Sequence, residues 1–211
     1  AEIIRRARKA NLPMVLDADG LFLLTQPETR NILTGYKRVV LTPNVAEYGR
    51  LLHSLRDDND TQPQLSTLEK LLEGNVIVKK GQYDEISSVV QSVHDGVSSV
   101  KRYDMVCEEL GGLKRSGGIG DVLAGTLGTF VAWHSILSSK EEEDDGALGK
   151  NNMDAQDRLV LACWSACCVV KRATNYAFQE KRRSMTAPDV LDTVGKAMDN
   201  MTFASIQQDK E

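Results

Sequence analysis

The chain has 211 residues, enough for one α/β domain with a buried core, and 41% of them are hydrophobic and 27% charged. Its net charge of −4 argues against a nucleic-acid-binding protein, because such proteins usually carry a basic face or stripe. No apolar run has the length that a membrane-spanning helix needs, so the composition is that of an ordinary soluble globular protein.

The first predicted element is a helix at residues 2–9, with Ile3, Ile4 and Ala7 on one side and cations on the other. The chain begins with Ala1 rather than Met. Because a natural chain rarely begins inside an element, we expect a further N-terminal portion to precede it. A targeting segment is therefore not observable in this sequence.

Short apolar runs then alternate with helical stretches. The runs at residues 13–17, 38–42 and 75–79 end in polar residues, which is typical of buried parallel strands, and residues 44–55 and 64–73 have helical spacing between them. Ligands of such sheets bind at the carboxyl ends of the strands. The polar or glycine residues predicted to lie there are Asp17, Asp19, Thr42, Asn44, Lys79, Lys80 and Gly81.

The second half of the chain changes character. Residues 86–104 alternate weakly around a turn signal at residues 94–96, which favours an antiparallel hairpin. Three helices are expected after it, with a charged mobile loop between the first two and a frayed tail at the end. These segments are a helix at 122 to about 135, a loop at 140–154, a helix at 155–181, a helix capped by Thr186, and the tail at 202–211.

A glycine-rich run at residues 111–120 lies between the hairpin and the next helix. Glycines let the backbone approach a ligand closely, and a helix N-terminus presents unpaired N–H groups, so the run predicts a phosphate site. Lys114 and Arg115 add positive charge. The run is not a Walker A loop, because Gly117 is followed by Gly118 rather than by Lys and Ser or Thr.

Asp121 follows the glycine run in the first turn of the helix. The simple alternative is a carboxylate that caps the helix. However, a carboxylate beside a phosphate site repels the anion unless it has a chemical task. We therefore favour a general base that accepts the proton of a hydroxyl attacking the γ-phosphorus of a nucleotide.

The four cysteines, Cys107, Cys163, Cys167 and Cys168, have no metal-ligand spacing, so buried reduced thiols are expected. Asn44 and Glu47 fit a capping box, while Lys80–Gly81 and Asp84 could belong to an ordinary turn. For Asp17 and Asp19, helix capping is slightly favoured over magnesium binding.

At this point the chain resembles a known family. Gly-Gly-Ile-Gly-Asp at 117–121, with the apolar helix after it, is similar to the Gly-x-Gly-Asp signature of the ribokinase-like superfamily. DADGLFLL, LTPNVAEYGRLL, VKKGQYDEIS and GGLKRSGGIGDVLAG resemble segments of the ATP-dependent NAD(P)H-hydrate dehydratases, and the resemblance covers nearly all of residues 2–200. It implies one ribokinase-like domain over residues 1–211, a three-layer α/β/α fold with a mostly parallel sheet and an antiparallel edge.

The resemblance also implies roles for individual residues. Asp121 would be the catalytic base and would contact the substrate, NADHX or NADPHX. The other substrate-binding residues would be Asn44, Val45, Ala46, Glu47, Tyr48, Gly49 and Arg50. ATP, with Mg²⁺, would be bound by Lys80, Gly81, Gln82, Tyr83 and Asp84 and by Gly111, Gly112, Leu113, Lys114, Arg115, Ser116, Gly117, Gly118, Ile119 and Gly120.

Two departures from the family pattern leave alternatives open. The family's Gly-Pro-Gly-Leu-Gly segment would precede Ala1, so the resemblance implies an N-terminally truncated chain, and Ile119 stands where the family usually has Gln. The alternatives are a ribokinase-like kinase of a vitamin or sugar and an impaired isoform that binds without turnover. Neither a nucleic acid nor a membrane is an expected partner, and the sequence leaves open whether the protein forms a homo-oligomer. The expected compartment is the cytoplasm or the mitochondrion.

Overall fold

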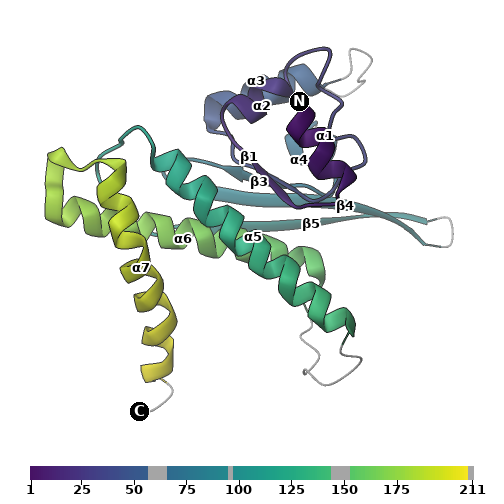
Figure 1. The fold of residues 1–211 in the computed structure, drawn as a ribbon. Helices are drawn as coiled ribbons and strands as arrows, with labels where there is room; N and C mark the ends of the chain where they lie inside the picture. Colours follow the sequence, from purple (N-terminus) through teal and green to yellow (C-terminus); the bar gives the residue numbers. More distant parts are fainter. Residues whose placement is uncertain (57–65, 95–96, 144–152, 209–211) are drawn as a thin grey trace.

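The computed structural model describes residues 1–56, 66–94, 97–143 and 153–208. Their sheet has five strands in the order β1-β2-β3-β4-β5 (Figure 1). The strands are β1 (Met14–Leu16), β2 (Val39–Leu41), β3 (Val76–Lys79), β4 (Asp84–His94) and β5 (Val97–Cys107). The first three pair in parallel and the last two are antiparallel, which confirms parallel units followed by an antiparallel edge, with a longer hairpin than predicted.

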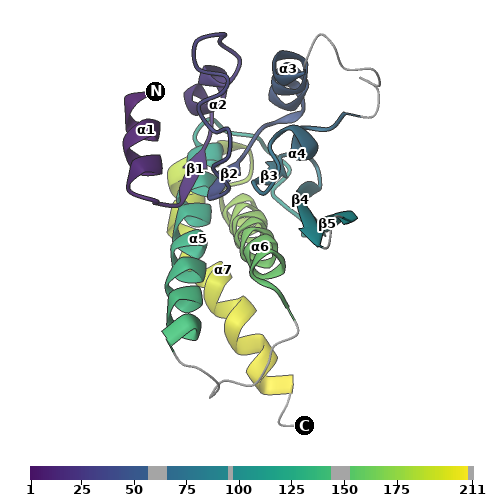
Figure 2. The ribbon, with the colours of Figure 1, turned by 90° about the vertical axis from the view of Figure 1, so that its right-hand side faces the viewer.

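Helices cover both faces of this sheet (Figure 2). They are α1 (Glu2–Lys9), α2 (Asp19–Leu23), α3 (Val45–Leu55), α4 (Leu68–Leu71), α5 (Ile119–Glu143), α6 (Ala155–Lys181) and α7 (Ala187–Gln208), with a 3₁₀ turn at Arg182–Ser184. The long helices α5 and α6 lie on one face, and α2, α3 and α4 lie on the other. The predicted three-layer α/β/α fold is therefore confirmed.

The central strands explain the three layers. Val39, Val40 and Leu41 of β2 are at most 1% exposed. Val39 and Leu41 pack with residues of α2, α3 and α4, whereas Val40 packs with residues of α5 and α6. Successive side chains of a strand point to opposite faces, so an uninterrupted apolar run is buried only between two helical layers. The four cysteines lie in these cores as buried free thiols, as expected.

Several predicted boundaries were wrong. The structure has helix only at 68–71 within the predicted 64–73, where Gln64 and Leu65 lie outside the described residues. Helix α5 begins at Ile119 and runs to Glu143 through the start of the predicted loop 140–154, because Lys140 and the glutamates after it favour helix. The rest of that loop is outside the described residues up to Asn152.

Helix α7 reaches Gln208, so most of the predicted frayed tail at 202–211 is helical. Thr186 precedes this helix as predicted, and both its backbone N–H and its hydroxyl donate to Asp189 Oδ2, at 2.7 and 2.6 Å. Helix α6 spans 155–181 as predicted, and its cap, Asp154, accepts a hydrogen bond from the N–H of Asp157. No helix of the described residues has the length and apolar character needed to cross a membrane.

Candidate active site

Among the described residues, a cavity of about 650 Å³ lies where β3, the glycine run and α6 meet. Both segments predicted to bind ATP line it, although they lie about thirty residues apart in sequence. The predicted residues that line it are Lys80, Gly81, Gln82, Tyr83, Asp84, Gly111, Gly112, Leu113, Lys114, Arg115, Ser116, Ile119 and Gly120. Gly117 and Gly118 of the predicted set are not among its lining residues.

Other lining residues were missed by the sequence reasoning. They are Glu109, Leu110, Leu123, Val170, Lys171 and Thr174. Lys171 and Thr174 are one helical turn apart on α6, and their side chains reach the two predicted ATP segments. The one sequence feature that could have pointed to these residues is that Lys171 directly follows a run of buried residues in α6. From the sequence alone, however, that lysine is interpreted as a solvated side chain.

Two glycines of the run are explained by their surroundings. A Cβ at Gly112 would lie 2.5 Å from the carbonyl oxygen of Thr174, and the N–H of Gly112 donates to Thr174 Oγ1 at 3.0 Å. Gly118 has φ +89°, a conformation that other residues rarely adopt, and it directly precedes α5. These positions let the run pass close to α6 and then enter α5.

Lys80 lies at the junction of the strand ends with α5. Its ammonium is 2.7 Å from Asp17 Oδ1, and both side chains are largely buried. A Cβ at Gly120 would be 3.4 Å from Asp17 Oδ2 and 3.8 Å from Lys80 Nζ, so the ion pair lies against the first turn of α5. The prediction that Asp17 caps α2 is therefore wrong: the cap position is Ala18, and Asp17 holds Lys80 instead.

The predicted substrate segment, residues 44–50, adjoins this junction. It begins with the predicted capping box, in which Asn44 Oδ1 accepts the Glu47 N–H at 2.9 Å and the Glu47 carboxylate accepts the Asn44 N–H at 2.8 Å. Asn44 forms a parallel bridge with Lys80. The segment does not line the cavity. Its exposed residues are Asn44, Val45, Ala46, Gly49 and Arg50.

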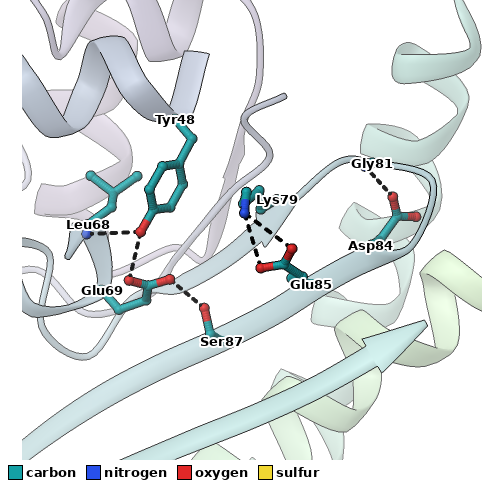
Figure 3. A network of polar contacts seen from close by, with 8 residues as sticks. All are labelled: Tyr48, Leu68, Glu69, Lys79, Gly81, Asp84, Glu85 and Ser87. Carbon is teal, nitrogen blue, oxygen red and sulfur yellow. Dashed lines mark hydrogen bonds and ion pairs between the residues drawn. The ribbon is translucent and has the colours of Figure 1, made fainter. Parts of the chain in front are cut away.

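The side chain of Tyr48 points toward Glu69 and anchors this segment (Figure 3). Its hydroxyl donates to Glu69 at 3.0 Å and accepts the Leu68 N–H at 3.3 Å, and Ser87 donates to the same carboxylate at 2.7 Å. Burial raises the pKa of Tyr48 to about 12. Burial opposes the charge of Glu69, but its hydrogen bonds, that from Ser87 first, hold its pKa below the ordinary value. The Tyr48 hydroxyl thus makes its hydrogen bonds to residues within the protein.

Asp121 occupies the first turn of α5, one residue after the cavity-lining Gly120. Its side chain is exposed and does not line the cavity; it borders a second hollow of about 470 Å³ between α5 and α7. Of the two cations at the lip, Arg115 is exposed, whereas Lys114 donates to the Met185 carbonyl at 2.6 Å. The catalytic role of Asp121 stays a prediction.

The part of the chain that the structure describes has no preformed set of protein ligands for a metal ion. No group of three His, Cys, Asp or Glu side chains is placed there to hold an ion. Asp17, whose carboxylate lies against Gly120 in the first turn of α5, is paired with Lys80. The described donor set therefore does not fit a metal held by the protein alone.

Comparison with known proteins gives a consistent result. Residues 1–196 match the profile of the family described as NAD(P)H-hydrate dehydratase. A Schizosaccharomyces pombe protein named ATP-dependent (S)-NAD(P)H-hydrate dehydratase is 41% identical over 201 residues, which are 93% of this chain and 54% of the relative. The protein of the same name from Emericella nidulans is 36% identical over 92% of this chain and 57% of the relative.

The fold also has a solved counterpart. A hypothetical protein from Streptococcus mutans has a TM-score of 0.52 and 16% identity, and the match covers 90% of this chain and 56% of that one. This likeness supports the fold alone. The chain spans about half the length of the relatives it matches. From the profile match and the relatives together, the chain belongs to the NAD(P)H-hydrate dehydratase family.

Proposed function

We propose that the protein uses ATP to dehydrate the (S)-form of NADHX or NADPHX, regenerating NADH or NADPH, and that the cavity binds MgATP. The observation that carries this proposal is the convergence of residues 80–84 with residues 111–116, 119 and 120 on one cavity next to the first turn of α5. A volume of about 650 Å³ suits a nucleotide-sized ligand.

The electrostatics favour phosphates at the α5 end of the cavity. The first turn of a helix presents unpaired N–H groups and a partial positive charge. The ammonium of Lys80 lies beside Gly120 at the same place. Together they suit the β- and γ-phosphates of ATP, and Mg²⁺ would enter bound to ATP and supply further charge neutralisation.

The chemistry follows from the poor leaving ability of hydroxide. The substrate hydroxyl attacks the γ-phosphorus, the new O–P bond forms, and ADP leaves. The ring nitrogen then pushes out phosphate, and loss of a proton from the neighbouring carbon restores the dihydropyridine. The sum is NADHX plus ATP to NADH, ADP and phosphate. In this proposal Asp121 takes the hydroxyl proton, and the glycine-run amides stabilise the transferring phosphoryl group.

The test incubates the 211-residue chain with MgATP and NADHX, with the Schizosaccharomyces pombe relative as the positive control. Recovery of the near-UV absorbance of reduced nicotinamide, with release of ADP and phosphate, is the expected result. A vitamin or sugar kinase would instead leave a stable phosphorylated product. Heat of ATP binding without turnover would contradict the proposed activity for this chain and favour a binding role.

A further inference from the structure

Lys171 is a largely buried cation that has no role in the proposed dehydration. Its Nζ donates to the carbonyl oxygens of Gly81 and Gln82, each at 2.9 Å, and lies 3.4 Å from Asp84 Oδ1. An ammonium has three hydrogens, and these three oxygens account for all of them. Although Lys171 lines the cavity, its donors are already engaged by residues 81–84.

Asp84 completes this arrangement from the other side of the turn. Its side chain is 6% exposed, and its Oδ1 also accepts the N–H of Gly81 at 2.9 Å (Figure 3). Burial raises the pKa of Asp84, while the Gly81 N–H and the charge of Lys171 act in the opposite direction. A buried carboxylate needs such a partner, since an uncompensated buried charge is costly.

The same turn of α6 also holds the glycine run. Thr174 Oγ1 accepts the N–H of Gly112 at 3.0 Å and donates to the Lys171 carbonyl at 2.7 Å. Residues three apart share one face of a helix, so Lys171 and Thr174 reach both walls of the cavity from one place. The separation of the two walls is therefore set by α6.

We propose that Lys171 is a positioning residue that, with Asp84, holds residues 80–84 in the shape that binds ATP, without contacting ATP itself. Lys171, Asp84 and the carbonyls of Gly81 and Gln82 are called the loop clamp below. This inference rests on the proposed function for its ligand. It also assigns Asp84, predicted to bind ATP, to the clamp.

The test uses the 211-residue chain with Lys171→Met, Asp84→Asn and the double variant. Lys181→Met is the matched control, because Lys181 lies on the same helix and pairs with the exposed Glu180. The dissociation constant for MgATP is measured by calorimetry. Hydrogen exchange of the peptide that spans residues 80–84 is measured without nucleotide, and thermal unfolding confirms that each variant folds.

Lys171→Met should weaken MgATP binding about tenfold, since it removes the ammonium that pairs with Asp84 and donates to the two carbonyls. Exchange of the 80–84 peptide should accelerate, and Lys181→Met should change neither quantity. The effect of the double variant on binding should be smaller than the sum of the two single effects, because the neutral amide introduced by Asp84→Asn no longer needs a cation.

Three results would overturn the clamp: unchanged MgATP binding in Lys171→Met, additive effects in the double variant, or weakened binding with unchanged exchange at 80–84. The last would mean that Lys171 touches ATP directly. If the wild-type chain binds no MgATP, the proposed function fails for this chain. The exchange experiment needs no nucleotide, so it still decides whether the clamp exists.

Discussion

The cavity and the neighbouring segment at residues 44–50 are built in different ways. The cavity walls are held by α6 through contacts between residues that lie 62 and 90 positions apart, Gly112 with Thr174 and Gly81 with Lys171. The segment at 44–50 begins with a capping box between residues three apart and exposes most of its side chains. The nucleotide side is thus held by contacts to α6, whereas the proposed substrate side combines a local capping box with the contacts of Tyr48 to Leu68 and Glu69.

The largest expected effect is a loss of turnover when the proposed catalytic base is removed. Asp121→Asn should lower dehydratase turnover by a factor on the order of a hundred to ten thousand, because the proposed base is lost. Its affinity for MgATP should stay within about twofold of wild type. Recovery of nicotinamide absorbance and calorimetry measure the two quantities, and Asp192→Asn on the exposed face of α7 is the control. Normal turnover in Asp121→Asn would exclude the base assignment.

The next test disturbs the tertiary contact of the glycine run. Gly112→Ala would place a Cβ 2.5 Å from the Thr174 carbonyl oxygen, so the run must move away from α6. MgATP binding should weaken about tenfold and stability should fall by about 1–3 kcal/mol. Gly195→Ala is the control, because nothing lies within 4 Å of that position. Equal behaviour of the two variants would show that α6 does not shape the cavity.

The junction of the two regions should give a smaller effect. Asp17→Asn removes the carboxylate 2.7 Å from Lys80 Nζ but leaves an amide of similar size. Without the charge partner the ammonium is held less firmly beside Gly120, and MgATP binding should weaken about threefold to tenfold. Asp19→Asn, two residues on and exposed, serves as the control. Tighter MgATP binding in Asp17→Asn would mean that Asp17 chiefly repels phosphate.

The smallest effect belongs to the segment at residues 44–50. Tyr48→Phe leaves Glu69 and the Leu68 N–H with one partner fewer and should reduce stability by about 1 kcal/mol, with MgATP affinity unchanged. Tyr176→Phe is the control, since Tyr176 accepts one exposed hydrogen bond from Asn200. Denaturant unfolding measures both variants, and equal stability of wild type and Tyr48→Phe would show that the hydroxyl does not anchor the segment.

The raised pKa of Tyr48 also predicts how the stability of the chain depends on pH. Burial raises its pKa from 10.0 to about 12 in the folded chain, so the folded state holds the phenolic proton more tightly than the unfolded state. Its contribution is present below pH 10 and is lost as the pH rises toward 12. The stability difference between wild type and Tyr48→Phe should therefore shrink over that range. A constant difference would mean that the hydroxyl is not buried in the fold.

Part of this architecture could be predicted because it depends on near neighbours. The bounds of α6, the capping box at Asn44 and the strand at 76–79 follow from apolar periodicity and from hydrogen bonds within a few residues. The predicted helix ends were wrong because they also rested on the pattern of near neighbours alone. Residues such as Lys140 favour helix but carry no apolar period, so a solvated extension and a loop look alike.

The long-range contacts could not be predicted. Asp17 meets Lys80, 63 residues later, because the strands β1 and β3 end at the same edge of the sheet. Lys171 faces Gly81 because α6 packs across the antiparallel hairpin. Asp17 and Lys80 could be placed at strand ends from the sequence, but neither their pairing nor the contact of Lys171 could be, since pairing depends on how distant elements pack.

The sequence by itself determined the alternation of strands and helices, the glycine run and its following Asp121, because these depend on residue type and short spacing. Only the tertiary structure decided that one turn of α6 holds both walls of the cavity, that Asp17 binds Lys80, and that Asp121 lies beside the cavity rather than in its lining. The physical reason is that hydrogen bonds and ion pairs act over a few ångströms, and packing decides which residues come that close.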